Sequence, residues 1–186
     1  MKYDKLTIVG LPKGFKVYEV TDYLYPNGRP ETPEDFVYGE LPAEYDEGER
    51  AMLLYEYKES ATGVYVVYNE AESSLKFELS PWASDADVRL YVKSINAVLK
   101  KHPRAKLYDQ NDALKGLTED DQNLMLKDWQ KFMEHMLKTK EGFTMDGLFT
   151  GFTLQVAHLR PAPTIEQQAS ELRKMFVDMQ WEIEEE

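Results

Sequence analysis

Residues 51–79, AMLLYEYKESATGVYVVYNEAESSLKFEL, decide the fold of this chain. They contain three apolar runs, which predict strands at 51–58, 63–69 and 75–79. Only short polar connections separate the runs, and connections this short join neighbouring strands of opposite direction. The stretch therefore predicts an antiparallel meander.

The three runs differ in how their residues alternate. In the last run, Leu75, Phe77 and Leu79 alternate with charged residues, which indicates one buried face and one face in water. The runs at 51–58 and 63–69 carry apolar residues on both faces. We therefore expect these two strands to be central in the sheet, with cover on each side.

Three helices are expected after the meander, each opened by a hydroxyl residue that can cap the first turn. Ser84, Thr118 and Thr164 are the expected N-caps, and Thr164 with Gln167 matches a capping box. Behind each cap, apolar residues recur at spacings of three and four, which predicts one buried stripe per helix. The stripes are Val88, Tyr91, Val92, Ile95, Val98 and Leu99; then Met125, Trp129, Phe132, Met133 and Met136; and then Ile165, Ala169, Leu172, Phe176 and Met179.

Shorter strands are expected in the rest of the chain. They are residues 6–9, 16–20 and 105–108, a hairpin region at 143–157 that turns at Asp146–Gly147, and an edge strand through Trp181 and Ile183. Strands cluster early and helices late, which is typical of an α+β protein. The prediction is a single domain over residues 1–186: a mainly antiparallel sheet with an N-terminal β-meander, packed against about three amphipathic helices.

An acidic loop at about residues 26–50 is the strongest functional signal. From Glu31 to Glu49 it carries eight carboxylates and no basic residue, with aromatic side chains among them. Long loops in compact domains are usually either functional or disordered. Carboxylates can steer a basic partner to the surface, and aromatic anchors can carry affinity. The predicted partner-binding residues are Glu34, Asp35, Phe36, Tyr38, Glu44, Tyr45, Asp46 and Glu47.

Composition excludes several classes of function. The formal net charge of −12 disfavours binding to nucleic acid and to anionic membranes. The absence of cysteine excludes disulfides, thiolate metal sites and a cysteine nucleophile, and it fits a reducing compartment. No run approaches the roughly 20 apolar residues that span a bilayer, and the start of the chain is too charged for a signal peptide. The predicted location is the cytoplasm.

Motifs for catalysis, metals or cofactors are absent from the sequence. His102, His135 and His158 do not pair at a metal-ligand spacing. The acidic residues around Asp109 fail the EF-hand pattern, because the sixth position of the loop is Leu114 and not glycine. No phosphate-binding glycine motif or nucleophile elbow occurs. We therefore assign no catalytic residue, metal ligand or cofactor; whether the chain is an enzyme stays open, with the balance against it.

Three hypotheses for function follow. The first is a non-catalytic cytoplasmic protein that presents the acidic segment to a basic protein, comparable by charge alone to an immunity protein or a DNA mimic. The second is a small-ligand-binding protein or enzyme with a tyrosine-lined pocket on the sheet, near Trp82 or Trp129, with His158 and Arg160 as its polar groups. The third is an oligomeric structural module that pairs through edge strands or the methionine-rich helix. The sequence leaves the oligomeric state open.

Overall fold

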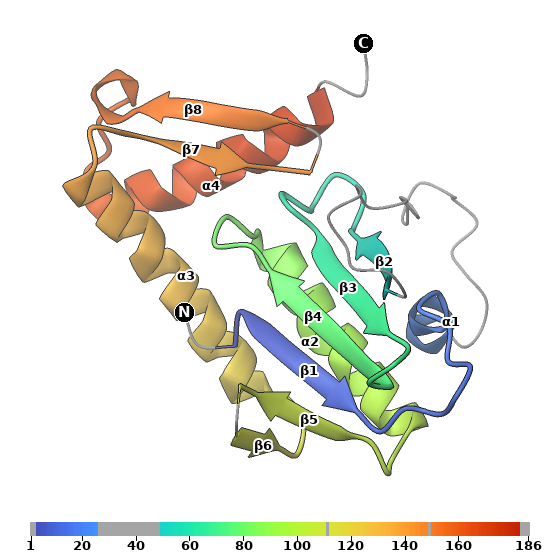
Figure 1. Cartoon of the computed structure of the whole chain (residues 1–186). Coiled ribbons are helices and arrows are strands. Elements are labelled where there is room, and N and C mark those ends of the chain that lie inside the picture. Colours follow the sequence, from blue (N-terminus) through green and yellow to red (C-terminus); the bar gives the residue numbers. More distant parts are fainter. Residues whose placement is uncertain (1–2, 26–48, 111, 149, 183–186) are drawn as a thin grey trace.

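The computed structural model describes residues 3–25, 49–110, 112–148 and 150–182 (Figure 1). Its main feature is a six-stranded sheet in the order β2-β3-β4-β1-β5-β6, in which all neighbouring strands are antiparallel. A separate two-stranded hairpin lies with the last helix beyond one end of this sheet. The predicted α+β class with a mainly antiparallel sheet is confirmed. The strands are β1 (Lys5–Val9), β2 (Glu49–Leu54), β3 (Val64–Asn69), β4 (Ser74–Leu79), β5 (Lys106–Asp109) and β6 (Asp112–Leu114).

The predicted meander is present as β2, β3 and β4, and β1 lies between β4 and β5. The register places Leu6 of β1 and Val66 of β3 on either side of Phe77, and all three side chains are fully buried on one face of the sheet. Lys76 and Glu78 alternate with them on the opposite face and are exposed or half-buried. The prediction of one wet face for β4 is therefore confirmed.

The predictions for the first strand of the meander were partly wrong. β2 lies at the edge of the sheet, not at its centre, and it ends at Leu54. Tyr55 and Tyr57 leave the strand and pack against the ring of Trp181, at centroid distances of 5.6 and 5.1 Å. The two tyrosines pack against a helix that is distant in the chain. The apolar run in the sequence is therefore longer than the strand.

The strand expected at residues 16–20 is also wrong, because this segment turns into the short helix α1 (Glu19–Leu24). The Glu19 carboxylate accepts a hydrogen bond from the Lys16 backbone N–H at 2.9 Å, which stabilises the turn before the helix. Val20 and Leu24 are buried one helical turn apart, and α1 packs beside α2 (Asp85–Lys101). Helical spacing of buried residues decided this segment.

All three predicted helices are confirmed, as α2, α3 (Glu119–Thr139) and α4 (Ile165–Glu182). Ser84 and Thr118 cap α2 and α3 in complete capping boxes, and the Thr164 hydroxyl accepts from the Gln167 N–H at 3.1 Å. The edge strand expected at the C-terminus is wrong at Trp181, which belongs to α4; Ile183 lies outside the described residues. The indole N–H of Trp181 donates to the Ser60 carbonyl at 2.9 Å, and this contact holds the last turn of α4 against the β2–β3 connection.

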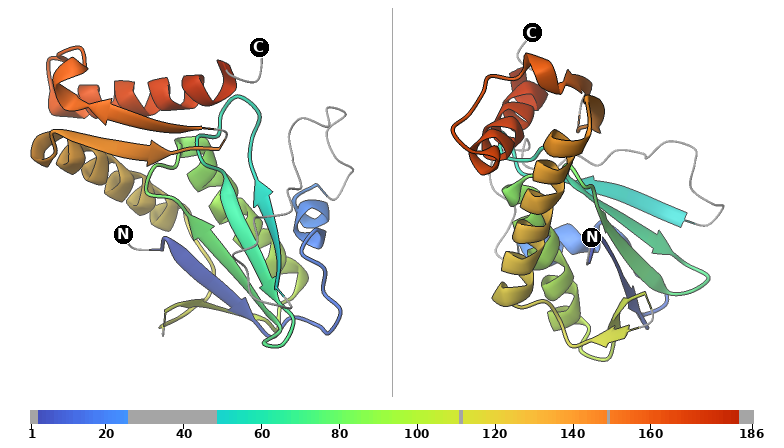
Figure 2. Two further views of the ribbon diagram at one scale, coloured as in Figure 1. Left: turned by 45° about the horizontal axis from the view of Figure 1, so that its top comes forward. Right: turned by 90° about the vertical axis from the view of Figure 1, so that its left-hand side faces the viewer.

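Two hydrophobic cores result, and α3 runs along both of them (Figure 2). The first lies between one face of the sheet and α1, α2 and the N-terminal part of α3, where Met125 and Trp129 are buried. The second lies between α3, α4 and the hairpin of β7 (Gly142–Asp146) and β8 (Gly151–Gln155), where Met133 and Leu137 are buried. The hairpin turns after Asp146, as predicted, and the short helix η2 (Val156–His158) follows it.

Candidate functional site

The predicted partner-binding surface falls in the part of the chain that the structure does not describe. Glu34, Asp35, Phe36, Tyr38, Glu44, Tyr45, Asp46 and Glu47 all lie outside the described residues. The described residues give the two elements that flank this segment. These are α1, which ends at Leu24, and the edge strand β2, which begins at Glu49.

Of the residues named for a pocket on the sheet, two are buried and two are exposed. Trp82 is buried in the second core, stacked on Phe143 at a centroid distance of 5.3 Å, whereas Trp129 is buried in the first core. His158 and Arg160 are exposed at and just after η2. Both tryptophans therefore take part in core packing, whereas both polar residues lie at the surface.

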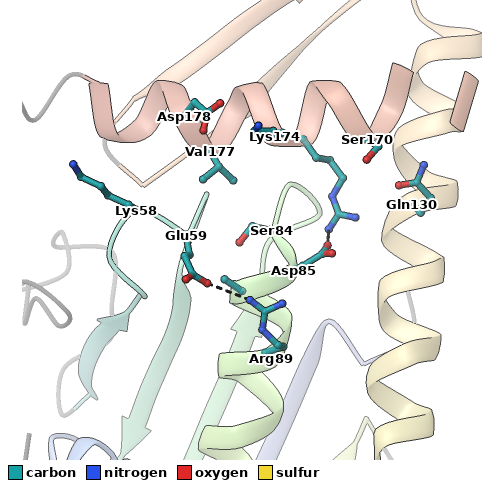
Figure 3. Close-up of a pocket in the computed structure, with 12 residues that line it drawn as sticks. Lys58, Glu59, Ser84, Asp85, Arg89, Gln130, Ser170, Lys174, Val177 and Asp178 are labelled. Carbon is teal, nitrogen blue, oxygen red and sulfur yellow. Dashed lines mark hydrogen bonds and ion pairs between the residues drawn. The ribbon is translucent and has the colours of Figure 1, made fainter. Parts of the chain in front are cut away.

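A charged cleft is formed instead by α2, α4 and the β2–β3 connection (Figure 3). It has a volume of about 430 Å³. Its cationic side chains are Lys58, Arg89, Arg173 and Lys174, and its carboxylates are Glu59, Asp85 and Asp178. Four cations and three carboxylates thus line the cleft, and the whole chain has a formal net charge of −12. The cleft therefore gathers four cationic side chains in a chain that is acidic overall.

Helical spacing places the charged side chains of the cleft on common faces. Asp85 and Arg89 lie one turn apart on α2, at its N-terminal end. Arg173, Lys174 and Asp178 lie on one face of α4. The buried stripe of α4 runs along the neighbouring face and packs into the second core. The amphipathic pattern that buries α4 therefore also directs its polar side chains into the cleft.

Arg173 is the most buried charge in the cleft, with 13% of its side chain exposed. Its Nη2 donates to the Ala83 carbonyl at 3.0 Å and pairs with Asp85 Oδ1 at 2.8 Å. Burial lowers the pKa of Arg173, and the charges of Asp85 and Asp87 oppose that shift. The guanidinium remains a cation, because an arginine pKa starts far above neutral pH. Arg173 therefore ties α4 to the start of α2 as a partly desolvated positive charge.

Arg89 forms the second ion pair of the cleft. Its Nη2 donates to Glu59 Oε2 at 3.2 Å, and about half of each side chain is exposed. Pairs that are this exposed contribute about 0–1 kcal/mol to stability. The Arg89–Glu59 pair is therefore easily rearranged, whereas the Arg173–Asp85 pair is held in place by its burial.

The fully buried carboxylate of Asp87 fixes the wall below the cleft. Its Oδ2 accepts from the backbone N–H groups of Ala61, Thr62 and Ser84 at 3.0, 3.1 and 2.8 Å, and its Oδ1 accepts from Gly63 N at 3.0 Å. One side chain thus joins the β2–β3 connection to the start of α2. Both of these elements line the cleft, so Asp87 sets their separation.

Glu56 provides a test of the electrostatics beside the cleft. Desolvation raises the pKa of Glu56, and the charge of Glu59 adds to that shift, while Arg89 and Lys93 oppose it. When the pKa of a carboxyl group is higher in the folded than in the unfolded state, the folded protein loses stability as the pH rises from the unfolded pKa to the folded pKa. We therefore expect Glu56→Gln to raise the melting temperature at pH 7.5 by a few degrees at most, with the gain shrinking toward pH 4. Thermal unfolding by circular dichroism across this pH range measures it.

Glu59→Gln is the matched control for this prediction, because Glu59 is more exposed and pairs with Arg89. At pH 7.5, Glu59→Gln should raise the melting temperature only by as much as the lost repulsion between Glu59 and Glu56 allows. A Glu56→Gln variant that melts lower than the wild-type protein at pH 7.5 would contradict the expected direction.

Sequence reasoning missed every charged residue of the cleft. Arg89 and Arg173 do stand beside buried stripe residues on their helices, and this is the only local signal that they carry. The two arginines are 84 residues apart in the chain. They line the same cleft only because of how α2 and α4 pack. No local pattern encodes that packing.

No protein family, curated protein or solved structure was found to match the chain. Among the described residues, no three histidine or carboxylate side chains gather as metal ligands. None of the described helices is both long enough and apolar enough to cross a bilayer. Function is therefore argued from the residues themselves.

Proposed function

We propose that this protein is a non-catalytic binding protein of the cytoplasm that presents its acidic, aromatic segment to a basic protein partner. The observation that carries the proposal is the concentration of eight carboxylates, without a basic residue, between Glu31 and Glu49. Charges of one sign at this density attract a cationic surface and increase the rate of encounter. The aromatic side chains among them are suited to become desolvated anchors in the complex.

The flanking elements support this proposal. On one side, Val20, Thr21 and Leu24 of α1 are buried against the fold. On the other, β2 pairs with β3 along its whole length, from Glu49 opposite Asn69 to Leu54 opposite Val64. Both ends of the acidic segment are thus attached to packed structure. Attachment at both ends lowers the conformational entropy that is lost when the segment binds a partner.

The test removes charge from the segment without changing the size of its side chains. The variant combines Glu34→Gln, Asp35→Asn, Glu44→Gln, Asp46→Asn and Glu47→Gln. Partners are captured from a cell extract at low salt with the wild-type protein, purified, and their binding kinetics are then measured at several salt concentrations. We expect the variant to bind about 10- to 100-fold more weakly, mainly through slower association, and to show a smaller dependence on salt.

A matched control removes five exposed carboxylates from other parts of the surface. These are Glu70, Asp112, Glu141, Glu171 and Glu182, each replaced by its amide. The control has the same total charge as the test variant but keeps the carboxylates of the acidic segment, so it should bind almost as the wild-type protein does. Equal weakening in both variants would mean that net charge alone attracts the partner, and the proposed role of the segment would then be wrong.

A further inference from the structure

The two arginines of the charged cleft use only part of their hydrogen-bonding capacity. Arg173 contacts Ala83 and Asp85 through Nη2, and Arg89 contacts Glu59 through Nη2. A guanidinium group has five N–H donors in a planar fork. Within the described part of the chain, Nε and Nη1 of both arginines therefore keep donors that no protein acceptor uses.

Two lysines lie around the cleft together with the arginines. Lys58 and Lys174 line the cleft from the β2–β3 connection and from α4 (Figure 3). With the two arginines they make four cationic side chains around the cleft. Burial strips water from Arg173, and the lowered pKa of this group indicates that Asp85 and Asp87 do not fully offset that loss.

We propose that the charged cleft binds a small molecule through a phosphate or carboxylate group, whose oxygens accept hydrogen bonds from the spare N–H groups of Arg173 and Arg89. Both groups present paired oxygens that match the guanidinium fork. The volume of about 430 Å³ is in the range of small-molecule sites. This inference does not rest on the acidic segment, and it holds or fails independently of the proposed function.

The roles of the two arginines differ in the proposed site. Arg173 is fixed by its contacts with Ala83 and Asp85, so its remaining donors have a set direction before a ligand arrives. Such preorganisation lowers the cost of binding. Arg89 is half exposed, and its pair with Glu59 can yield to a ligand oxygen. If the cleft had a purely structural role, phosphate and succinate would affect its residues no more than sodium chloride does at the same ionic strength.

The experiment is a titration of the ¹⁵N-labelled protein, followed by NMR, with inorganic phosphate, succinate and sodium chloride at matched ionic strength. We expect saturable shifts of the backbone amides at 84–89 and 170–178 with phosphate, succinate or both, and no such shifts with chloride. Phosphate alone would identify a phosphate ligand, and succinate alone a carboxylate ligand. Absence of saturable shifts with either anion would overturn the proposal.

Two variants test the residues that would hold the anion. Arg89→Gln combined with Lys174→Gln removes two cations whose side chains are exposed, so the fold should be retained. We expect this double variant to bind the anion at least about tenfold more weakly, as loss of charge-assisted hydrogen bonds implies. The control is Lys115→Gln with Lys127→Gln, which removes the same charge from exposed positions outside the cleft. Unchanged affinity in the double variant, or equal loss in the control, would overturn the assignment.

Discussion

Asp87→Asn is expected to lower the free energy of unfolding by about 3–5 kcal/mol, since it breaks a buried polar network. The Asp87 carboxylate accepts from four backbone N–H groups, those of Ala61, Thr62, Gly63 and Ser84. An asparagine side chain has one acceptor oxygen, and its NH₂ group would face N–H donors that then lack a partner. Each buried donor left unsatisfied costs about 1–3 kcal/mol.

Urea unfolding followed by circular dichroism measures the effect, and Asp121→Asn is the matched control. Asp121 holds the same capping-box position in α3 as Asp87 holds in α2. Its capping-box contacts are exposed, so its loss should cost only about 1 kcal/mol, as is typical of a cap. A loss from Asp87→Asn no greater than that from Asp121→Asn would show that the contacts with the β2–β3 connection add nothing to stability.

Trp129→Ala is expected to cost about 3–5 kcal/mol, the range for removing a large aromatic side chain from a core. Trp129 is 1% exposed, and its indole N–H donates to the Ser80 carbonyl at 2.8 Å. It lies on α3, the helix shared by both cores, with Met125 in the first core and Met133 in the second. If residues 1–186 form a single cooperative domain, the loss should destabilise both cores equally.

Hydrogen exchange of the amides in β3 and in the β7–β8 hairpin, measured across a urea series, follows the two cores separately. We expect the most protected amides of both regions to lose the same free energy of opening in Trp129→Ala. Trp129→Phe keeps an aromatic ring in the core but removes the N–H donor and part of the ring volume, so a loss smaller than that of Trp129→Ala is expected. Loss of protection in β3 alone would indicate two independent units and contradict the single-domain prediction.

Residues that cap helices were predictable because their contacts are local. Ser84, Thr118 and Thr164 each cap a backbone N–H three residues ahead, and the apolar stripes follow at spacings of three and four. Such contacts depend only on residues close in the chain, so a sequence pattern contains them in full. The pairing of β3 with β4 was predictable for the same reason, since the short connection from Asn69 to Ser74 leaves little choice of pairing, whereas the connection from Leu54 to Val64 is longer than the sequence pattern indicated.

The secondary structure of short apolar runs was not predictable, because a few residues are too few to distinguish helical spacing from strand alternation. Residues 16–20 fit a strand pattern, yet the chain forms α1 where Val20 and Leu24 pack beside α2. Trp181 alternates with glutamates in sequence, yet it belongs to α4 because its ring packs on Tyr55 and Tyr57. In both cases a distant surface, absent from the local pattern, decided the conformation.

The amino-acid sequence by itself determined the α+β class, the meander, the three long helices and the acidic segment at 31–49, because composition and near-neighbour spacing carry that information. Only the tertiary structure decided the place of β2 at the sheet edge, the sharing of α3 by two cores, and the charged cleft. Arg89 and Arg173 come together through the packing of two helices that are distant in the chain. Packing of that kind depends on the complementary shapes of whole faces, and no spacing within either helix specifies it.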